Sequence, residues 1–474
     1  MIPIVKIPLV VEAYSPVFKE LFTVEGFEHF QRYVSGLLLS DNKTVEAINR
    51  LFIIDERHQS SLNRFLNNSP YDIVALNDRG LTWLNGDPST AFKDEGKIRG
   101  VLALDDTLFE HYGDQFDHIA YLHDHSKGHS ILAHNLVNLH YVDDKVDYPV
   151  DFRLWEPAKL DELEKSLIEG GVKIKPDKLA FKQTAPKRWK QHLMYLYVKN
   201  RKTGTVKAIY KTKIDLAMSM LKYFFDRHGD KDLPVAFDSW YTLPEFCKHI
   251  DKELKKGYVG ALKPSEEILL LGWEKIKASD FAERLKKRHS DEIKQGRPGI
   301  FVKTGIWYKG KKECYHSYCA VHHIIGFEKQ LLAINFKEEN LSDSPKFVIS
   351  NRLTWHAEGI TRIYRHRWHI EAYHEEGKEE GPDKYELRNC EAIKRHIAMI
   401  IVAYSYLQRL RFDQSLLNRL EWKPKESEKG NSLRFRRRAL TYEALTTIIY
   451  WFTENMYNQQ EIRKMMNCLK QAYK

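Results

Sequence analysis

The chain has 474 residues, of which 43% are hydrophobic and 12% aromatic, so it can bury more than one core and is not a disordered polypeptide. Lysine and arginine outnumber aspartate and glutamate by 75 to 65, a balance that favours a polyanionic partner. Five scattered cysteines and the lack of a signal-peptide core or long apolar run predict a soluble, cytoplasmic protein with no membrane segment.

Residues 1–95 are expected to form a helical N-terminal DNA-binding domain. Apolar residues recur at helical spacing in 27–40, 44–52 and 59–68. The last two segments have the lengths of a helix-turn-helix, and a small structural bundle is the alternative. The second of them would offer these polar side chains to base edges and phosphates: Gln59, Ser60, Asn63 and Arg64.

The pattern then changes to strands and predicts an α/β core. Strands are expected at 100–107, 129–144 and 146–155, the last two as a hairpin. A basic stretch at 173–207 is expected to be a surface elaboration or loop. The core should continue with helix 213–229, strand 233–241, helix 243–254 and strand 257–263.

Four segments complete the predicted organisation. Residues 96–263 would form the first part of the core, and 264–345 a β-rich insertion. Residues 346–411 would return to the core with two long helices, the first beginning near His356. Residues 412–474 would form a basic helical C-terminal region.

The first of those long helices carries an unusual charged face. At about 100° per residue, Tyr364, Arg367, Glu371 and Lys378 fall within about 60° of one another. The face therefore presents a phenol, a guanidinium, a carboxylate and an ammonium. A solvated face with Arg367 and Glu371 as an ordinary i,i+4 pair is the alternative.

Two predicted strands end in acids, at Asp105 with Asp106 and at Asp238. The ends of strands are where open α/β sheets build their sites. With Glu371, three converging carboxylates could hold two Mg²⁺ ions, which prefer oxygen ligands and can promote in-line displacement at phosphorus. Arg367 and Lys378 would then clamp phosphates.

These residues resemble a known signature. The spacing Tyr-x2-Arg-x3-Glu-x6-Lys matches the Y-R-E-K signature of IS4-like DDE transposases at Tyr364, Arg367, Glu371 and Lys378. "LDDT" around Asp106 and "FDSWY" around Asp238 resemble the two aspartate motifs of that group. "RYVSGLL" and "SSLNRFLNNSPYD" resemble its IS701 branch.

The resemblance implies a ribonuclease-H-like catalytic core with a β-rich insertion between Asp238 and Glu371. It implies a metal-binding triad of Asp106, Asp238 and Glu371, with two Mg²⁺ ions that Mn²⁺ can replace. Its first motif places the catalytic aspartate directly before threonine, which favours Asp106 over Asp105. The resemblance further implies that these residues hold transposon-end DNA: Tyr364, Arg367 and Lys378.

The expected function is therefore that of a DDE transposase that cuts and joins double-stranded DNA at insertion-sequence ends. By resemblance, it would act as a homodimer on two ends. A ribonuclease-H-like nuclease without strand transfer and a catalytically retired, domesticated DNA-binding protein are the alternatives.

Other patterns are weaker. Cys314, His316, Cys319, His322 and His323 lie close in sequence, but strand alternation would send them to two faces, so we do not expect a zinc site. Two tryptophans could stack a flipped base or simply belong to the core: Trp307 and Trp355. The following arginines could track phosphates or form a solubilising face: Arg434, Arg436, Arg437 and Arg438.

Overall fold

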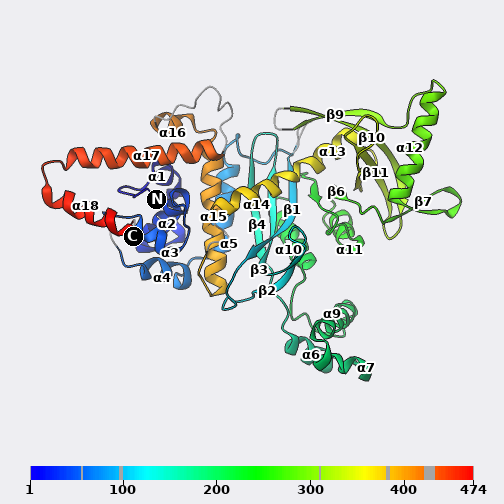
Figure 1. Cartoon of the computed structure of the whole chain (residues 1–474), viewed down its shortest axis with the longest axis horizontal. Coiled ribbons are helices and arrows are strands. Elements are labelled where there is room, and N and C mark those ends of the chain that lie inside the picture. The colour runs from blue at the N-terminus through cyan, green and yellow to red at the C-terminus, as the bar shows by residue number, and fades with distance from the viewer. Residues whose placement is uncertain are drawn as a thin grey trace.

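A computed structural model describes residues 2–54, 57–94, 100–308, 311–380, 385–420 and 433–472. Its centre is a twelve-stranded mixed sheet in the order β2-β3-β1-β5-β6-β12-β11-β10-β7-β8, with β4 paired to β3 and β9 to β10 (Figure 1). The strands are β1 Val101–Glu110, β2 Ala120–Asp124, β3 His129–Val142, β4 Asp147–Leu154, β5 Val235–Phe237, β6 Tyr258–Ala261, β7 Glu267–Leu269, β8 Lys275–Lys277, β9 Val302–Tyr308, β10 Lys311–Ile324, β11 Lys329–Phe336 and β12 Lys346–Ser350.

The half of the sheet that carries the predicted acids contains its parallel strands. β5 lies between β1 and β6 and is parallel to both. β3 is antiparallel to β1 and to β4, so the predicted hairpin is confirmed. The short strand β2, which pairs with the start of β3, was not predicted because its residues are half exposed and include two charged or titratable side chains in five.

The β-rich segment 264–345 extends the same sheet. β6 pairs with β12, β12 with β11, and β11 with β10, all antiparallel. The segment also contains a helix that was not predicted, α12 at Ala278–Lys294, together with the one-turn helix η3 at Leu271–Trp273. Only a narrow stripe of α12 is buried, so its apolar signal is weak.

Helices cover both faces of the sheet beside β1 and β5. Helix α10 (Lys213–Arg227) begins with a capping box between Thr212 and Asp215 and packs on one face. Helices α13 (Ala357–His366) and α14 (Trp368–Glu380) follow each other along the opposite face. The connection from β5 to β6 contains α11 at Pro244–Lys248 and one π-helical turn, η2, at His249–Glu253.

The N-terminal and C-terminal helices share one core with the edge of the sheet. Helix α15 is the centre of this core, which also includes Phe109 of β1 and Leu136 of β3. The helix-turn-helix expected from 44–52 and 59–68 corresponds to α3 (Val45–Arg50) and α4 (Ser60–Asn68), which are farther apart in sequence than the three- to four-residue turn of that motif allows. The helices of this core are α1 Leu9–Tyr14, η1 Ser15–Leu21, α2 Val24–Leu39, α3 Val45–Arg50, α4 Ser60–Asn68, α5 Ile73–Asn85, α15 Cys390–Leu410, α16 Gln414–Arg419 and α17 Leu433–Glu454. Helix α18 (Gln459–Ala472) instead packs through Met465 in a separate small cluster with Ile53.

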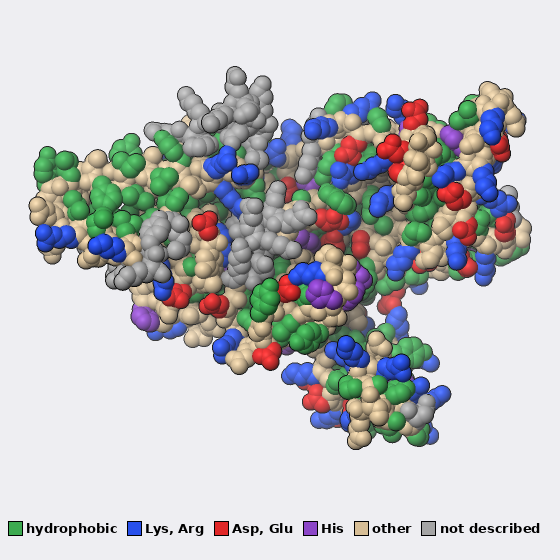
Figure 2. All heavy atoms as spheres, in the orientation of Figure 1, with side chains coloured by type: hydrophobic (Ala, Val, Ile, Leu, Met, Phe, Trp, Pro, Cys, Tyr) green, Lys and Arg blue, Asp and Glu red, His purple; other side chains and the backbone are tan. Residues whose placement is uncertain are grey.

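The basic stretch, expected to be a surface elaboration or a loop, is an elaboration: it lies in a small helical lobe, residues 157–212. The lobe is inserted in the chain between β4 and α10 and projects from the body of the molecule (Figure 1). Figure 2 shows Lys and Arg side chains on its visible face. Its own small core includes Leu163, Trp189, Leu193 and Tyr197. The helices of the lobe are α6 Leu160–Glu169, α7 Pro176–Leu179, α8 Phe181–Thr184 and α9 Pro186–Lys202.

A search of the described helices for a bilayer-spanning segment, judged by length and hydropathy, finds none.

Candidate active site

The register between β1 and β5 places two acids side by side at the point where β5 ends. The parallel pairing ends with Leu104 opposite Phe237, so Asp105 and Asp238 come next on the two strands. The backbone N–H groups of Trp240 and Tyr241 donate to Oδ1 of Asp238, at 2.9 and 3.2 Å. These bonds hold the Asp238 carboxylate in the turn that follows β5.

Asp105 and Asp106 point to opposite faces of the sheet, as neighbours on a strand must. Leu102 and Leu104 pack with α10, whereas Val101 and Ala103 pack on the side of α13 and α14. Alternation therefore directs Asp105 toward α13 and α14, and Asp106 toward α10.

Hydrogen bonds confirm these orientations. The guanidinium of Arg367, at the junction of α13 and α14, donates to Oδ2 of Asp105 at 2.7 Å and also to Glu371 on α14. Asp106 instead accepts from Asn135 at 2.7 Å, from the Lys213 ammonium at 2.9 Å and from the Tyr241 hydroxyl at 3.0 Å. The residue that shares a partner with Glu371 is thus Asp105, although the motif favoured Asp106.

Arg367 is not part of a solvated face. It is 5% exposed, and its guanidinium lies 5.4 Å from the ring centroid of Tyr364. The i,i+4 ion pair with Glu371 does form, but it forms beside the sheet and includes Asp105 as a third member. A buried cation with two carboxylates is a feature of an organised site rather than of a helix surface.

The electrostatics of the site favour added positive charge. Burial raises the pKa of Asp105 to about 7; the Arg367 charge opposes this rise, while Asp238 and Asp106 add to it. Burial also raises the pKa of Tyr364, against the effect of Arg367.

Asp105, Asp106 and Asp238 border a cavity of about 700 Å³, whereas Glu371 does not line it. Basic side chains reach it from two directions, Lys213 at the start of α10 and Lys263 after β6. The ammonium of Lys213 also lies 4.1 Å from the ring centroid of Trp240, which is 40% exposed. The sequence patterns did not identify Lys213, Lys263 or Asn135, because single basic and amide residues outside a motif give no signal.

Three carboxylates would suit Mg²⁺. Asp105 lies next to Asp238 by strand register and shares Arg367 with Glu371, but the ligand atoms of these three acids do not form a group within 4.8 Å. Within the described residues, the only group of three candidate ligand atoms within 4.8 Å of one another is His118, Glu156 and Cys390. In the acidic site, Arg367 lies between Asp105 and Glu371 and supplies the positive charge there.

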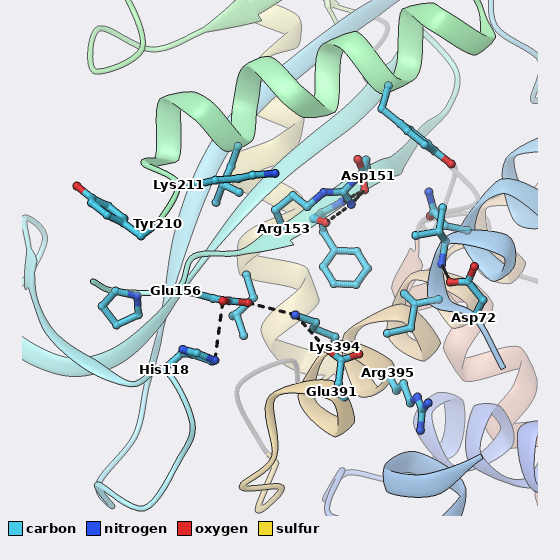
Figure 3. A pocket seen from close by; sticks show the side chains of 18 of the residues that line it. Asp72, His118, Asp151, Arg153, Glu156, Tyr210, Lys211, Glu391, Lys394 and Arg395 are labelled. Carbon is cyan, nitrogen blue, oxygen red and sulfur yellow. Dashed lines mark hydrogen bonds and ion pairs between the residues drawn. The ribbon is translucent and has the colours of Figure 1, made fainter. Parts of the chain in front are cut away.

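The His118 cluster lies at the edge of a second cavity, of about 790 Å³ (Figure 3). There the carboxylate of Glu156 is already paired, because the Lys394 ammonium lies 3.2 Å from it. Lys394 also bonds Glu391 at 3.0 Å, and Arg153 bonds the buried Asp151 (Figure 3).

The remaining predicted residues are Lys378 and two tryptophans. Lys378 falls within α14, but its side chain lies outside the described residues. Trp307 on β9 is 62% exposed, and Trp355 packs with the α13 side of the sheet.

The cysteines and histidines of β10 form no three-ligand group among the residues described. In the C-terminal region, Arg436 is buried, whereas Arg434 and Arg438 are exposed, so the arginine cluster is not one solvated patch. In the N-terminal region, Asn63 and Arg64 of α4 are exposed, while Leu62 and Phe65 are in the core.

Comparison with known proteins identifies the family of this site. No curated protein matches the chain. The family of DDE superfamily endonucleases matches residues 16–270, which cover more than half of the chain and include both aspartate motifs. Members of that superfamily are metal-dependent nucleases that act on DNA. The chain therefore belongs to the DDE superfamily endonucleases.

Proposed function

We propose that this protein is a DDE transposase of the IS4-like, IS701-related type, which hydrolyses a phosphodiester at an insertion-sequence end and joins the freed 3′-hydroxyl to target DNA. The observation that carries the proposal is the shared Arg367, which links Asp105 on β1 to Glu371 on α14 beside Asp238. The sheet order β4-β3-β1-β5-β6, with helices on both faces, supports the expected ribonuclease-H-like core.

The proposed ligands are Asp105, Asp238 and Glu371, with Asp105 in place of the expected Asp106. Two bound Mg²⁺ ions, replaceable by Mn²⁺, would activate the attacking oxygen and stabilise the leaving oxygen. Asp106 is a positioning residue in this proposal, because its bonds to Lys213, Asn135 and Tyr241 join β1 to β3, α10 and the turn after β5.

Basic and aromatic residues would position the DNA strand. Two of the five N–H groups of Arg367 orient Asp105 and Glu371, and in this proposal a further N–H of its terminal nitrogens meets a phosphate. Lys213 and Lys263 border the cavity at the acids, where the phosphates of the cut strand would lie. The proposal retains Tyr364 and Lys378 as DNA contacts, and it includes two protomers because two ends must be cut and joined together.

A strand-transfer assay tests the proposal. Duplexes copied from the DNA that borders the gene, both intact and pre-cleaved at the end, are incubated with supercoiled plasmid in Mg²⁺, Mn²⁺ or EDTA. We expect metal-dependent cutting of the intact duplex and joining of the pre-cleaved one, both lost in Glu371→Gln. Cutting without joining would support the nuclease alternative, and end-specific binding without cutting would support the retired protein.

A further inference from the structure

The excess positive charge of the chain is concentrated in the helical lobe. Residues 157–212 contain 14 Lys and Arg but only 5 Asp and Glu. Subtracting these from the 75 and 65 of the whole chain leaves 61 basic and 60 acidic residues elsewhere. From residue 178 to residue 214 there is no acid at all. The rest of the protein is therefore close to neutral, and the lobe provides almost all of its long-range attraction for a polyanion.

Helix α9 arranges part of this charge on one outward face. Its buried side chains, Trp189, Leu193 and Tyr197, hold the helix on the core of the lobe. At about 100° per residue, Lys187, Arg188 and Lys199 fall within an arc of about 120° on the opposite side.

That face contains no acid, and its centre holds Tyr195, which is 64% exposed. Lys187, Arg188 and Lys199 are exposed and have no acidic partner among the described residues. They span about 18 Å along the helix, the rise of about five phosphates along one DNA strand. An ordinary solvated helix face would interleave both signs of charge, and this one does not.

The lobe is held firmly next to the acidic site. Arg201 at the end of α9 makes two 2.7 Å hydrogen bonds to Asp215 in the capping box of α10. Lys202 pairs with Glu245 of α11. Met194 of α9 and Tyr210 line the same cavity as Asp105 and Asp238.

Tyr210 also lines the second cavity, so the base of the lobe lies between the two; Figure 3 shows Tyr210 and Lys211 there. A strand in the acidic site would therefore pass beside the lobe.

We propose that the helical lobe binds the phosphate backbone of duplex DNA next to the cut site, through Lys187, Arg188 and Lys199 on α9. The proposal rests on the proposed function, because it assigns a DNA contact to a protein that cuts DNA. The contact is independent of base sequence, since each ammonium or guanidinium group meets a phosphate rather than a base edge.

The test measures the affinity of the full-length protein for a random-sequence duplex at several salt concentrations. Glu371→Gln is present throughout so that the duplex is not cut. Removal of one cation from a phosphate should reduce the slope of log affinity against log salt by about 0.9. Lys187→Gln, Arg188→Gln and Lys199→Gln together should therefore reduce the slope by about three and weaken binding at least about tenfold.

A matched triple variant serves as control: Lys19→Gln, Lys287→Gln and Lys294→Gln. These lysines are also exposed and without an acidic partner among the described residues, and the net charge changes by the same amount. We expect its slope to fall by less than one. The charge-conserving set Lys187→Arg, Arg188→Lys and Lys199→Arg should retain the parent slope, which shows that the slope depends on the charge at these positions. An unchanged thermal transition of the Gln variant excludes a folding defect.

Equal slopes for the lobe variant and the control would overturn the proposal, as would capture of another protein by the lobe with unchanged DNA affinity. Such results would leave the proposed function intact as long as the protein with Glu371 still cuts and joins DNA. If the lobe variant loses duplex affinity but the protein with Glu371 does not cut DNA, the result counts against the proposed function and not against the lobe contact.

Discussion

Asp105 and Asp106 are adjacent on β1, so their side chains point to opposite faces of the sheet. Asp105 and Asp106 both follow an apolar run, and the sequence contains two equal candidates because it does not say which face of the strand α13 and α14 will cover. The motif before Thr107 favoured Asp106, whereas the register with β5 and the bond from Arg367 direct Asp105 toward Glu371. Only tertiary packing distinguishes the two faces of a strand whose neighbours are apolar on both sides.

Asp105→Asn and Asp106→Asn should therefore differ in cleavage. We expect Asp105→Asn to reduce the single-turnover rate more than about 100-fold, because it removes a proposed metal ligand. Asp106→Asn should reduce the rate by about tenfold, since Asn135, Lys213 and Tyr241 still surround the site. A larger loss in Asp106→Asn would return the ligand role to Asp106.

Arg367→Lys tests the bridge between the two carboxylates. Lysine keeps the charge but cannot donate two N–H groups in the fixed geometry by which Arg367 reaches Asp105 and Glu371. We expect cleavage to fall by about 10- to 100-fold with unchanged overall fold. Activity within twofold of the parent in the same assay would show that charge alone is enough.

At the scale of elements, the position of α13 depends on ion pairs at both of its sides. Asp144, in the turn after β3, accepts from Arg362 at 3.0 Å and from His366 at 2.9 Å. Arg365 makes two bonds, of 2.9 and 3.0 Å, to Glu313 on β10. The helix that leads to Arg367 is thereby attached to the β3–β4 turn and to the extended sheet.

Asp144→Asn should destabilise the protein in a pH-dependent way. Burial alone would raise the pKa of Asp144, but bonds from His366 and Arg362 outweigh it and lower the pKa to about 2. Because the folded-state pKa is below the unfolded one, the stabilisation is present above about pH 4 and is lost as the pH falls toward 2.

We expect a loss of about 1 kcal/mol at pH 7, measured by urea unfolding, after allowance for the partial exposure of the pair. The difference between the variant and the parent should shrink as the pH falls from 4 toward 2. A pH-independent difference would show that the pair contributes packing rather than charge.

The sequence predicted elements with a strong apolar period and missed those without one. The strand that precedes Asp238 and the buried helix α15 were predicted. The strand with Asp105 was also predicted, but β1 continues past both acids to Glu110, so they do not stand at its end. The single long helix expected from near His356 is divided at Arg367 into α13 and α14. The helical lobe was missed because its core is small, and its many lysines are more typical of a loop.

At the scale of the molecule, the helical ends and the sheet are not packed as separate bodies. Helices α2, α4 and α5 all contact α15, and their buried side chains join those of β1 and β3 in one core. The boundary predicted at residue 95 follows a change in sequence pattern, but it does not separate the hydrophobic core. Hydrophobic periodicity in a sequence indicates the type of a local element, but it does not indicate which distant helix packs against that element.

Deletion of residues 1–95 should therefore prevent folding of the remainder. The deletion would expose the apolar face of α15. The free energy of hydrophobic burial lost in this way would exceed the free energy of unfolding of an ordinary domain. We expect no cooperative thermal transition by circular dichroism. Deletion of α18, whose buried hydrophobic residue among those described is Met465, is the control and should leave the transition in place. A cooperative transition in the first fragment would show an independent N-terminal domain.

The proposed metal-binding role of Asp105, Asp238 and Glu371 is the feature on which the proposed chemistry depends most. Titration of Mn²⁺ by electron paramagnetic resonance, which detects the free ion, measures this role without DNA or turnover. We predict that Asp105→Asn weakens Mn²⁺ binding at least about tenfold and that Asp106→Asn changes it less than about threefold. Undiminished binding in Asp105→Asn, together with loss of binding in Asp106→Asn, would contradict the site described here.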